Sequence, residues 1–210
     1  MQMKTTGKIT FALLSAVILF TLAGCGNFRR ALYITEKKTQ VWEQDGLVLA
    51  LTFLDDATLL KRYGDTESNP FITAYNQALL RRIVPFELKI INNSPQEITI
   101  STRDSFCTFN DIRIMTYNQF EMESYWDKQD EFDSIPEDKR ADKLQTMLRH
   151  QVDTYEVIPI GTTFNKVLTF VGDTQDIGTA KISIGILERN TKRVLTRCEF
   201  YYEFTDPPVK

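Results

Sequence analysis

Histidine is the scarcest reactive residue of this chain: His150 is the only one in 210 residues. A side chain that gives and takes protons near neutral pH is most often a histidine. One histidine among scattered serines and aspartates is no sign of a catalytic triad, because geometry defines a triad. We expect His150 to have a surface or helix-capping role and the protein not to be an enzyme.

Other common site signatures are also missing. The sequence has three cysteines and no closely spaced cysteine or histidine pairs, which excludes the usual zinc patterns. It has no glycine-rich phosphate loop, dinucleotide fingerprint or nucleophile elbow, so we expect no cofactor. It has no block of basic residues and a net charge of -3, which argues against nucleic-acid binding.

A hydrophobic run long enough to span a bilayer is absent too. The longest, residues 9–22, has about 14 residues, whereas a transmembrane helix needs ~20. Lys4 and Lys8 precede this run and small residues follow it, which is the pattern of a secretory signal peptide. We assign residues 1–24 to that signal.

The end of the run, Leu22-Ala23-Gly24-Cys25, resembles the lipobox of bacterial lipoproteins. The resemblance implies that the signal is cut before Cys25 and that Cys25 carries fatty acyl chains such as palmitate. It further implies a lipid anchor in a membrane of the cell envelope. The residue after the cysteine is Gly26 rather than the aspartate of retained lipoproteins, which favours the outer membrane over the inner one.

Two cysteines remain after Cys25. Outside the cytosol, Cys107 and Cys198 could form a disulfide. They could equally be two buried free thiols, because cysteine is among the most buried residue types. The sequence leaves both readings open.

The rest of the chain is predicted to be mainly β. Residues 25–45 lack a clear apolar period and are interpreted as a tether, although Val41 and Trp42 are good strand residues. Residues 46–206 contain about seven short strands separated by turn signals, which predicts an antiparallel β-sandwich. The clearest alternation of inward and outward residues lies at 86–90, 182–186 and 194–204.

Part of this pattern resembles immunoglobulin-like domains of bacterial surface lipoproteins. Residues 86–94 form a strand that ends in an Asn-Asn turn, and residues 160–170 form a turn and a strand that ends in Phe. The resemblance implies an immunoglobulin-like β-sandwich. This chain departs from the Pro-Gly turn of that family, because Ile160 separates Pro159 from Gly161.

A helical insertion is expected at about residues 120–151. Ser134 to Glu137 resembles a capping box that opens a helix, and an apolar stripe follows at Ala141, Leu144, Leu148 and Val152. Several carboxylates surround Tyr125 and Trp126. Their spacing lacks the order of a calcium loop, so we expect a solvated acidic loop and no metal.

Tyr125 and Trp126 have two interpretations: a surface for interaction with another protein, or the core of the insertion. We expect a lipid-anchored protein that works as a non-catalytic binding or structural module and contacts a protein of the envelope or surface. The alternatives are a carrier or sensor of a small apolar ligand, which requires a closed pocket, and a hydrolase.

Overall fold

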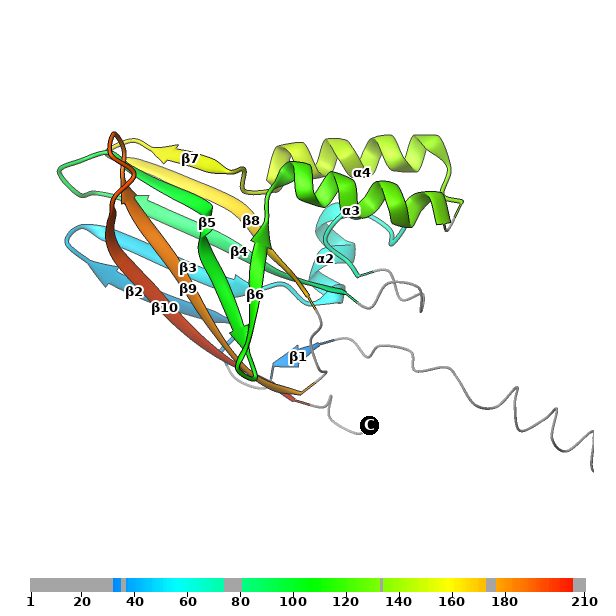
Figure 1. The fold of residues 1–210 in the computed structure, drawn as a ribbon, viewed down its shortest axis with the longest axis horizontal. Helices are drawn as coiled ribbons and strands as arrows, with labels where there is room; N and C mark the ends of the chain where they lie inside the picture. Colours follow the sequence, from blue (N-terminus) through cyan, green and yellow to red (C-terminus); the bar gives the residue numbers. More distant parts are fainter. Residues whose placement is uncertain (1–31, 35–36, 74–80, 133, 173–176, 206–210) are drawn as a thin grey trace, which may run out of the picture.

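A computed structural model describes residues 32–34, 37–73, 81–132, 134–172 and 177–205 (Figure 1). In this part of the chain the strands and helices are β1 (Tyr33–Ile34), β2 (Thr39–Gln44), β3 (Leu47–Phe53), α2 (Asp56–Tyr63), β4 (Arg82–Asn92), β5 (Ile98–Phe109), β6 (Ile112–Tyr117), α3 (Gln119–Phe132), α4 (Glu137–His150), β7 (Tyr155–Ile158), β8 (Thr162–Gly172), β9 (Gly178–Glu188) and β10 (Val194–Thr205).

The strands of the described residues form one antiparallel sheet in the order β1-β10-β9-β5-β6-β8-β4-β3-β2, with β7 added beside β5. Strand β6 joins the two halves: Met115 is paired with Phe106 of β5, and Thr116 is paired with Phe170 of β8. The sheet curls so that the half with β9 and β10 faces the half with β3 and β4 (Figure 1). The prediction of a mainly β, antiparallel fold is therefore confirmed.

The main core fills the space between the two halves. The rings of Phe53 in β3 and Phe204 in β10 lie 5.2 Å apart, and those of Phe86 in β4 and Tyr202 in β10 lie 5.0 Å apart. The Tyr202 hydroxyl also donates a hydrogen bond of 2.5 Å to the Leu51 carbonyl. Because β6 continues from one half into the other, the two halves are parts of one sheet, whereas an immunoglobulin-like sandwich has two. The immunoglobulin-like assignment therefore stays a prediction.

The tether predicted for residues 25–45 is wrong in its second half. Leu32 is buried, β1 pairs with β10, and the whole of β2 pairs with β3. Val41 and Trp42, the two good strand residues of this stretch, do lie in β2. Strand β2 has no clear apolar period because it lies at an edge of the sheet, where Val41 is exposed and only Trp42 packs against the core. Backbone pairing with β3 holds such a strand without an apolar period of its own.

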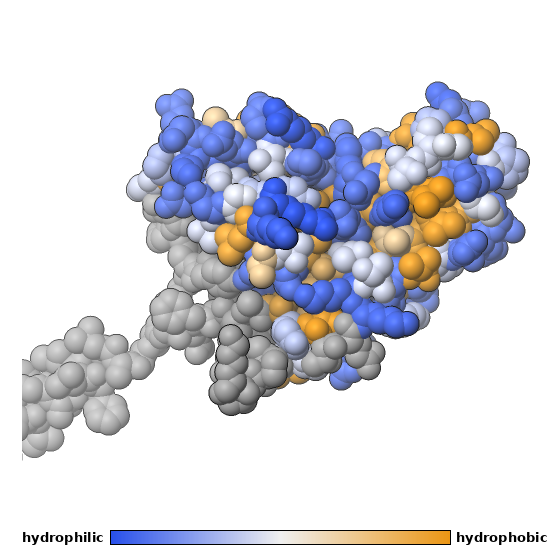
Figure 2. Space-filling view, turned by 180° about the vertical axis from the view of Figure 1, so that it is seen from behind, coloured by the Kyte–Doolittle hydropathy of each residue, from blue (hydrophilic) through white to orange (hydrophobic). Residues whose placement is uncertain are grey.

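Two helices, α3 and α4, follow β6 in the interval where a helical insertion was expected, and they lie over one end of the sheet (Figure 1). Seen from behind, the surface of this helical end is mostly hydrophilic, whereas hydrophobic residues gather on the opposite, strand-built side (Figure 2). None of the helices in the described ranges is long and apolar enough to cross a bilayer.

Candidate functional site

The pair of helices has a small core of its own against the sheet. Its buried members come from β4, α3, α4 and β8: Ile83, Met122, Tyr125, Trp126, Met147 and Val171. Helix α4 turns back along α3, and Gln119 of α3 donates a hydrogen bond to the Leu148 carbonyl of α4. The sheet and the second helix together therefore fix the position of α3.

The buried face of α4 differs from the predicted stripe. Lys143 and Met147 are buried, whereas Ala141 and Leu148 are exposed. The prediction is confirmed for the other two stripe residues, since Val152 is buried and Leu144 packs against the small core. Lys143 is buried because it meets Trp126 and Asp130 of α3, and Met147 because it packs in the core that α3 and the sheet share. The predicted capping box is also absent: Pro136 is the N-cap residue, and no side chain caps the helix.

Tyr125 and Trp126 do not form an interaction surface. Their exposed fractions are 7% and 5%. The indole Nε1 of Trp126 donates a hydrogen bond of 2.9 Å to the Pro70 carbonyl, and the Tyr125 hydroxyl donates one of 3.3 Å to the Arg81 carbonyl. Of the two interpretations of this pair, burial supports the core of the insertion and not an interaction surface. The rings attach the insertion to the rest of the domain through their apolar bodies and polar ends.

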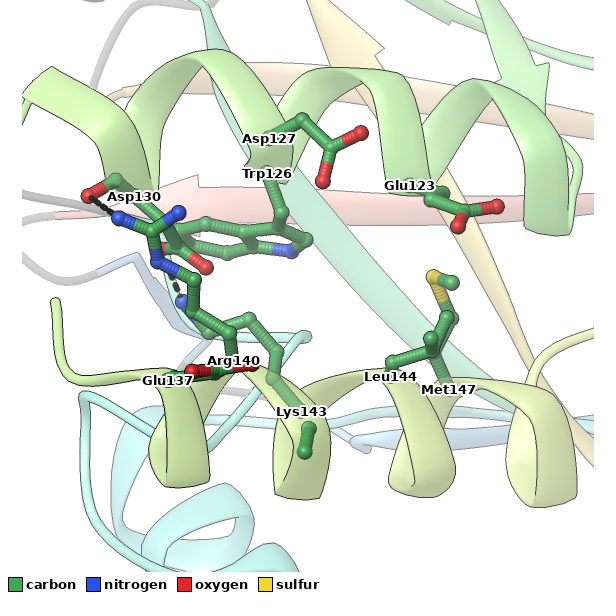
Figure 3. Close-up of a pocket in the computed structure, with 10 residues that line it drawn as sticks. Glu123, Trp126, Asp127, Asp130, Glu137, Arg140, Lys143, Leu144 and Met147 are labelled. Carbon is green, nitrogen blue, oxygen red and sulfur yellow. Dashed lines mark hydrogen bonds and ion pairs between the residues drawn. The ribbon is translucent and has the colours of Figure 1, made fainter.

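A groove of about 240 Å³ runs between α3 and α4. Its lining is formed by Glu123, Trp126, Asp127, Asp130, Glu137, Arg140, Ala141, Lys143, Leu144 and Met147. Trp126, Leu144 and Met147 lie in the space between the two helices and form an apolar floor (Figure 3). Among the described parts of the chain, this groove is the best candidate for a binding site.

An ion pair lies at one end of the groove. The Lys143 Nζ atom is 2.5 Å from the Asp130 Oδ1 atom, and the side chains are only 4% and 5% exposed. The same ammonium group lies 3.8 Å from the centre of the Trp126 ring. Both charges are thus used within the protein, and Lys143 is held as a structural cation rather than as a free nucleophile.

The rim of the groove is acidic. Glu123, Asp127 and Glu137 are exposed. The single exposed cation of the lining, Arg140, donates hydrogen bonds to the carbonyls of Asp130 (3.1 Å) and Ile135 (2.9 Å) (Figure 3). An apolar floor with a negative rim is complementary to an apolar group that carries a positive charge.

The acidic residues of α3 are not gathered into a metal site. Asp130 is occupied by Lys143, and Asp133 lies outside the described residues. Within the described ranges no three acidic, histidine or cysteine side chains are close enough to hold an ion.

His150, the last residue of α4, is exposed and lies beside the Tyr63 ring at 5.2 Å between centroids. Its pKa is lowered by partial burial and by the neighbouring cations Arg149 and Lys166. Burial and the two cations thus favour the neutral imidazole of His150, even though it is the last residue of a helix. His150 lies away from the groove lining and offers it no acid or base.

Cys107 and Cys198 are both free and buried. Cys107 in β5 pairs with Ile182 of β9, and Cys198 in β10 pairs with Ile184 on the other side of β9. With a whole strand between them, their Cα atoms are ~10 Å apart, beyond the ~7 Å that a disulfide can bridge. Burial raises the pKa of each thiol to about 12. Of the two readings of these cysteines, the structure supports two buried free thiols and not a disulfide.

The lipobox residues Leu22, Ala23, Gly24 and Cys25 lie outside the described residues. The residues that sequence reasoning missed in the groove are Arg140, Lys143 and Met147. No pattern could have marked Lys143, since a buried lysine and a solvated one look the same in a sequence.

Comparison with known proteins gives little further guidance. No protein-family model matches the chain, and no curated protein matches it. The fold is similar to that of YcdA, a presumed lipoprotein of Bacillus subtilis, with 9% sequence identity and a TM-score of 0.44. The similarity covers 81% of this chain and only 40% of the other, and likeness of this degree carries no argument about function.

Proposed function

We propose that this protein is a lipid-anchored protein of the bacterial envelope and works as a non-catalytic binding module. The observation that carries the proposal is the groove between α3 and α4, which has an apolar floor and an acidic rim. The groove fits binding rather than catalysis, because the buried Lys143 and Asp130 are paired with each other and the lining has no histidine or cysteine.

The anchor rests on the sequence. A basic start, a short apolar run and Leu22-Ala23-Gly24-Cys25 together fit lipidation at Cys25. Two or three acyl chains hold a protein on a membrane almost permanently, at ~0.8 kcal/mol for each buried methylene. Gly26 favours the outer membrane.

The partner we propose is a segment of another envelope protein that presents an apolar side chain next to a lysine or arginine. The apolar part would cover Ala141 and Leu144, which are exposed and half-buried, and the cation would lie near Glu123 and Asp127. The carrier alternative requires a closed pocket of several hundred Å³, whereas the space between the sheet halves is filled by phenylalanine, leucine and isoleucine side chains.

The groove is tested by photo-crosslinking in intact cells. A photoreactive residue at Ala141, which lines the groove, is compared with one at Asp142, which is exposed on the same helix outside it. We expect a discrete adduct from position 141 alone. The double variant Glu123→Lys/Asp127→Lys should reduce that adduct at least tenfold, whereas Glu43→Lys on β2 should not. Equal adducts from both positions, or no effect of charge reversal, would contradict the proposed contact.

The anchor is tested separately. The native protein should fractionate with membranes after a salt wash and carry lipid mass on its N-terminal cysteine, and Cys25→Ser should do neither. If Cys25→Ser stays with the membrane, the lipid is not what holds the protein there.

A further inference from the structure

The point where the chain enters the domain lies at the same end of the sheet as two exposed isoleucines, Ile112 and Ile177. Tyr33 of β1 pairs with Thr205 of β10, and Phe204 pairs with Gly178 at the start of β9. On the other side of β9, Ala180 pairs with Phe109 of β5, which in turn pairs with Ile112 at the start of β6. The entry point, Ile177 and Ile112 therefore lie at the same end of neighbouring strands.

Ile112 and Ile177 are 53% and 48% exposed. They lie on either side of Asn110, whose side-chain amide donates to the Ile177 carbonyl (3.1 Å) and accepts from the Thr179 N–H (2.9 Å). These bonds tie the β5–β6 turn to the start of β9. The two isoleucines are thus presented to solvent on a fixed piece of backbone.

The link from Cys25 to this end is short. Only residues 26–31 separate Cys25 from Leu32, which is buried in the domain. Fully extended, that link spans at most ~25 Å. The eleven residues of β9 run from this end to the opposite one, a distance of roughly 36 Å. If the opposite end rested on the membrane, the entry point would lie above the membrane by about the length of β9. The link is shorter than β9, so it cannot reach from the membrane to an entry point at that height.

We infer that the end of the sheet that carries β1, Ile112 and Ile177 is the face that rests on the lipid surface, with both isoleucines at the boundary between head groups and acyl chains. The inference depends on the proposed lipidation of Cys25. Ile112 lies four strand spacings from β1, or roughly 19 Å, which is within reach of the anchored link. Arg29 and Arg30 in the link add attraction to anionic head groups.

This orientation also places the groove. The six residues of β6 carry the chain away from Ile112 over ~20 Å before α3 begins. In Figure 1 the helices α3 and α4 lie at the side of the sheet opposite to β1. The groove is thereby held clear of the bilayer, where it is accessible to a partner from the aqueous space.

The inference is tested with the full lipidated protein in vesicles of phosphatidylethanolamine and phosphatidylglycerol. A single reporter cysteine, Ile112→Cys or Ile177→Cys, is labelled with an environment-sensitive fluorophore, since the two native thiols are buried. The matched control is Ile160→Cys, because Ile160 is also 53% exposed but lies in the turn between β7 and β8 at the opposite end. We expect lipids with a nitroxide head group to quench the labels at 112 and 177 at least threefold more than the label at 160.

Two failures are distinguishable. If intact mass shows lipid on Cys25 and the labels at 112 and 177 are quenched no more than the label at 160, the orientation is wrong and the anchor stands. If the mass shows no lipid, the anchor fails and this inference fails with it.

Discussion

The Gln40 side chain connects the two open edges of the curled sheet by bonding twice to Tyr201. Its Oε1 atom accepts a hydrogen bond of 3.0 Å from the Tyr201 N–H, and its Nε2 atom donates one to the Tyr201 carbonyl. Gln40 lies in the edge strand β2, and Tyr201 lies in β10, beyond the short stretch that β1 covers. The amide thus takes the place that a neighbouring strand would fill, which protects part of an exposed edge.

We predict that Gln40→Ala weakens this closure. Loss of the two bonds should lower the free energy of unfolding by about 1 kcal/mol and speed hydrogen exchange of the Tyr201 amide. The control is Gln44→Ala at the other end of β2, where the side chain bonds only to the adjacent Asp45. Equal exchange rates at Tyr201 in both variants would show that the bridge does not protect the edge.

The buried ion pair gives a second prediction. Asp130→Asn leaves the Lys143 ammonium without its carboxylate in a buried site, and it should cost about 3–5 kcal/mol in urea unfolding. The double variant Asp130→Leu/Lys143→Met replaces both charges with apolar groups and should recover most of that loss. Removal of one partner of the exposed pair Lys181–Glu199 should have little effect. A double variant as unstable as the single one would mean that the pair itself stabilises the helices.

The two thiols give a third prediction. Cys107 and Cys198 should not react with a maleimide in the folded protein, because they are buried and their raised pKa leaves almost no thiolate near neutral pH. Both should react in urea without added reductant. A mass lower than expected by two hydrogen atoms, restored by reductant, would show a disulfide and contradict the strand order β5-β9-β10.

His150 gives a fourth prediction, which is convenient to measure because the chain has one histidine. Its NMR titration should have a midpoint below ~6.5, the value of an unperturbed histidine. Arg149→Ala and Lys166→Ala should each raise the midpoint, whereas Arg113→Ala on β6 should not.

The sign of the accompanying stability change follows from the same shift. Because the folded protein holds its proton less tightly than the unfolded chain, the free energy of unfolding should fall as the pH drops from ~6.5 towards the folded pKa. Above ~6.5 it should not depend on His150. A midpoint above ~6.5 would mean that burial and the two cations do not lower the pKa of His150.

The sequence was most informative where burial follows the strand period. In β10, Cys198 and Phe200 are buried and Glu199 between them is exposed, as the alternation predicts. In β9, Ile182, Ile184 and Ile186 are buried, but Ser183 and Gly185 between them are buried too, because both faces of this strand are covered. Val194 shares the parity of Cys198 and Phe200 yet is exposed, because an irregularity in the β9–β10 pairing falls between Val194 and Thr196. Pairing register depends on the partner strand, which no single segment encodes.

The candidate site was less predictable, because its members owe their burial to contacts between helices. Trp126 is enclosed by Lys143 and by the Pro70 carbonyl, which come from other parts of the chain. Leu148 has the residue type of a core position but is exposed. Helical period alone shows that α4 has two faces and leaves open which one the neighbouring helix covers.

The pairing of β1 with β10 has a consequence for how the domain is made. A chain is synthesised from its N-terminal part onwards, so Tyr33 and Ile34 are made long before β10, the strand that receives them. Contacts this distant in sequence form late and slowly. Strand β10 thus completes the sheet beside β1, and a chain that stops before Val194 should lack a closed fold and be open to proteolysis.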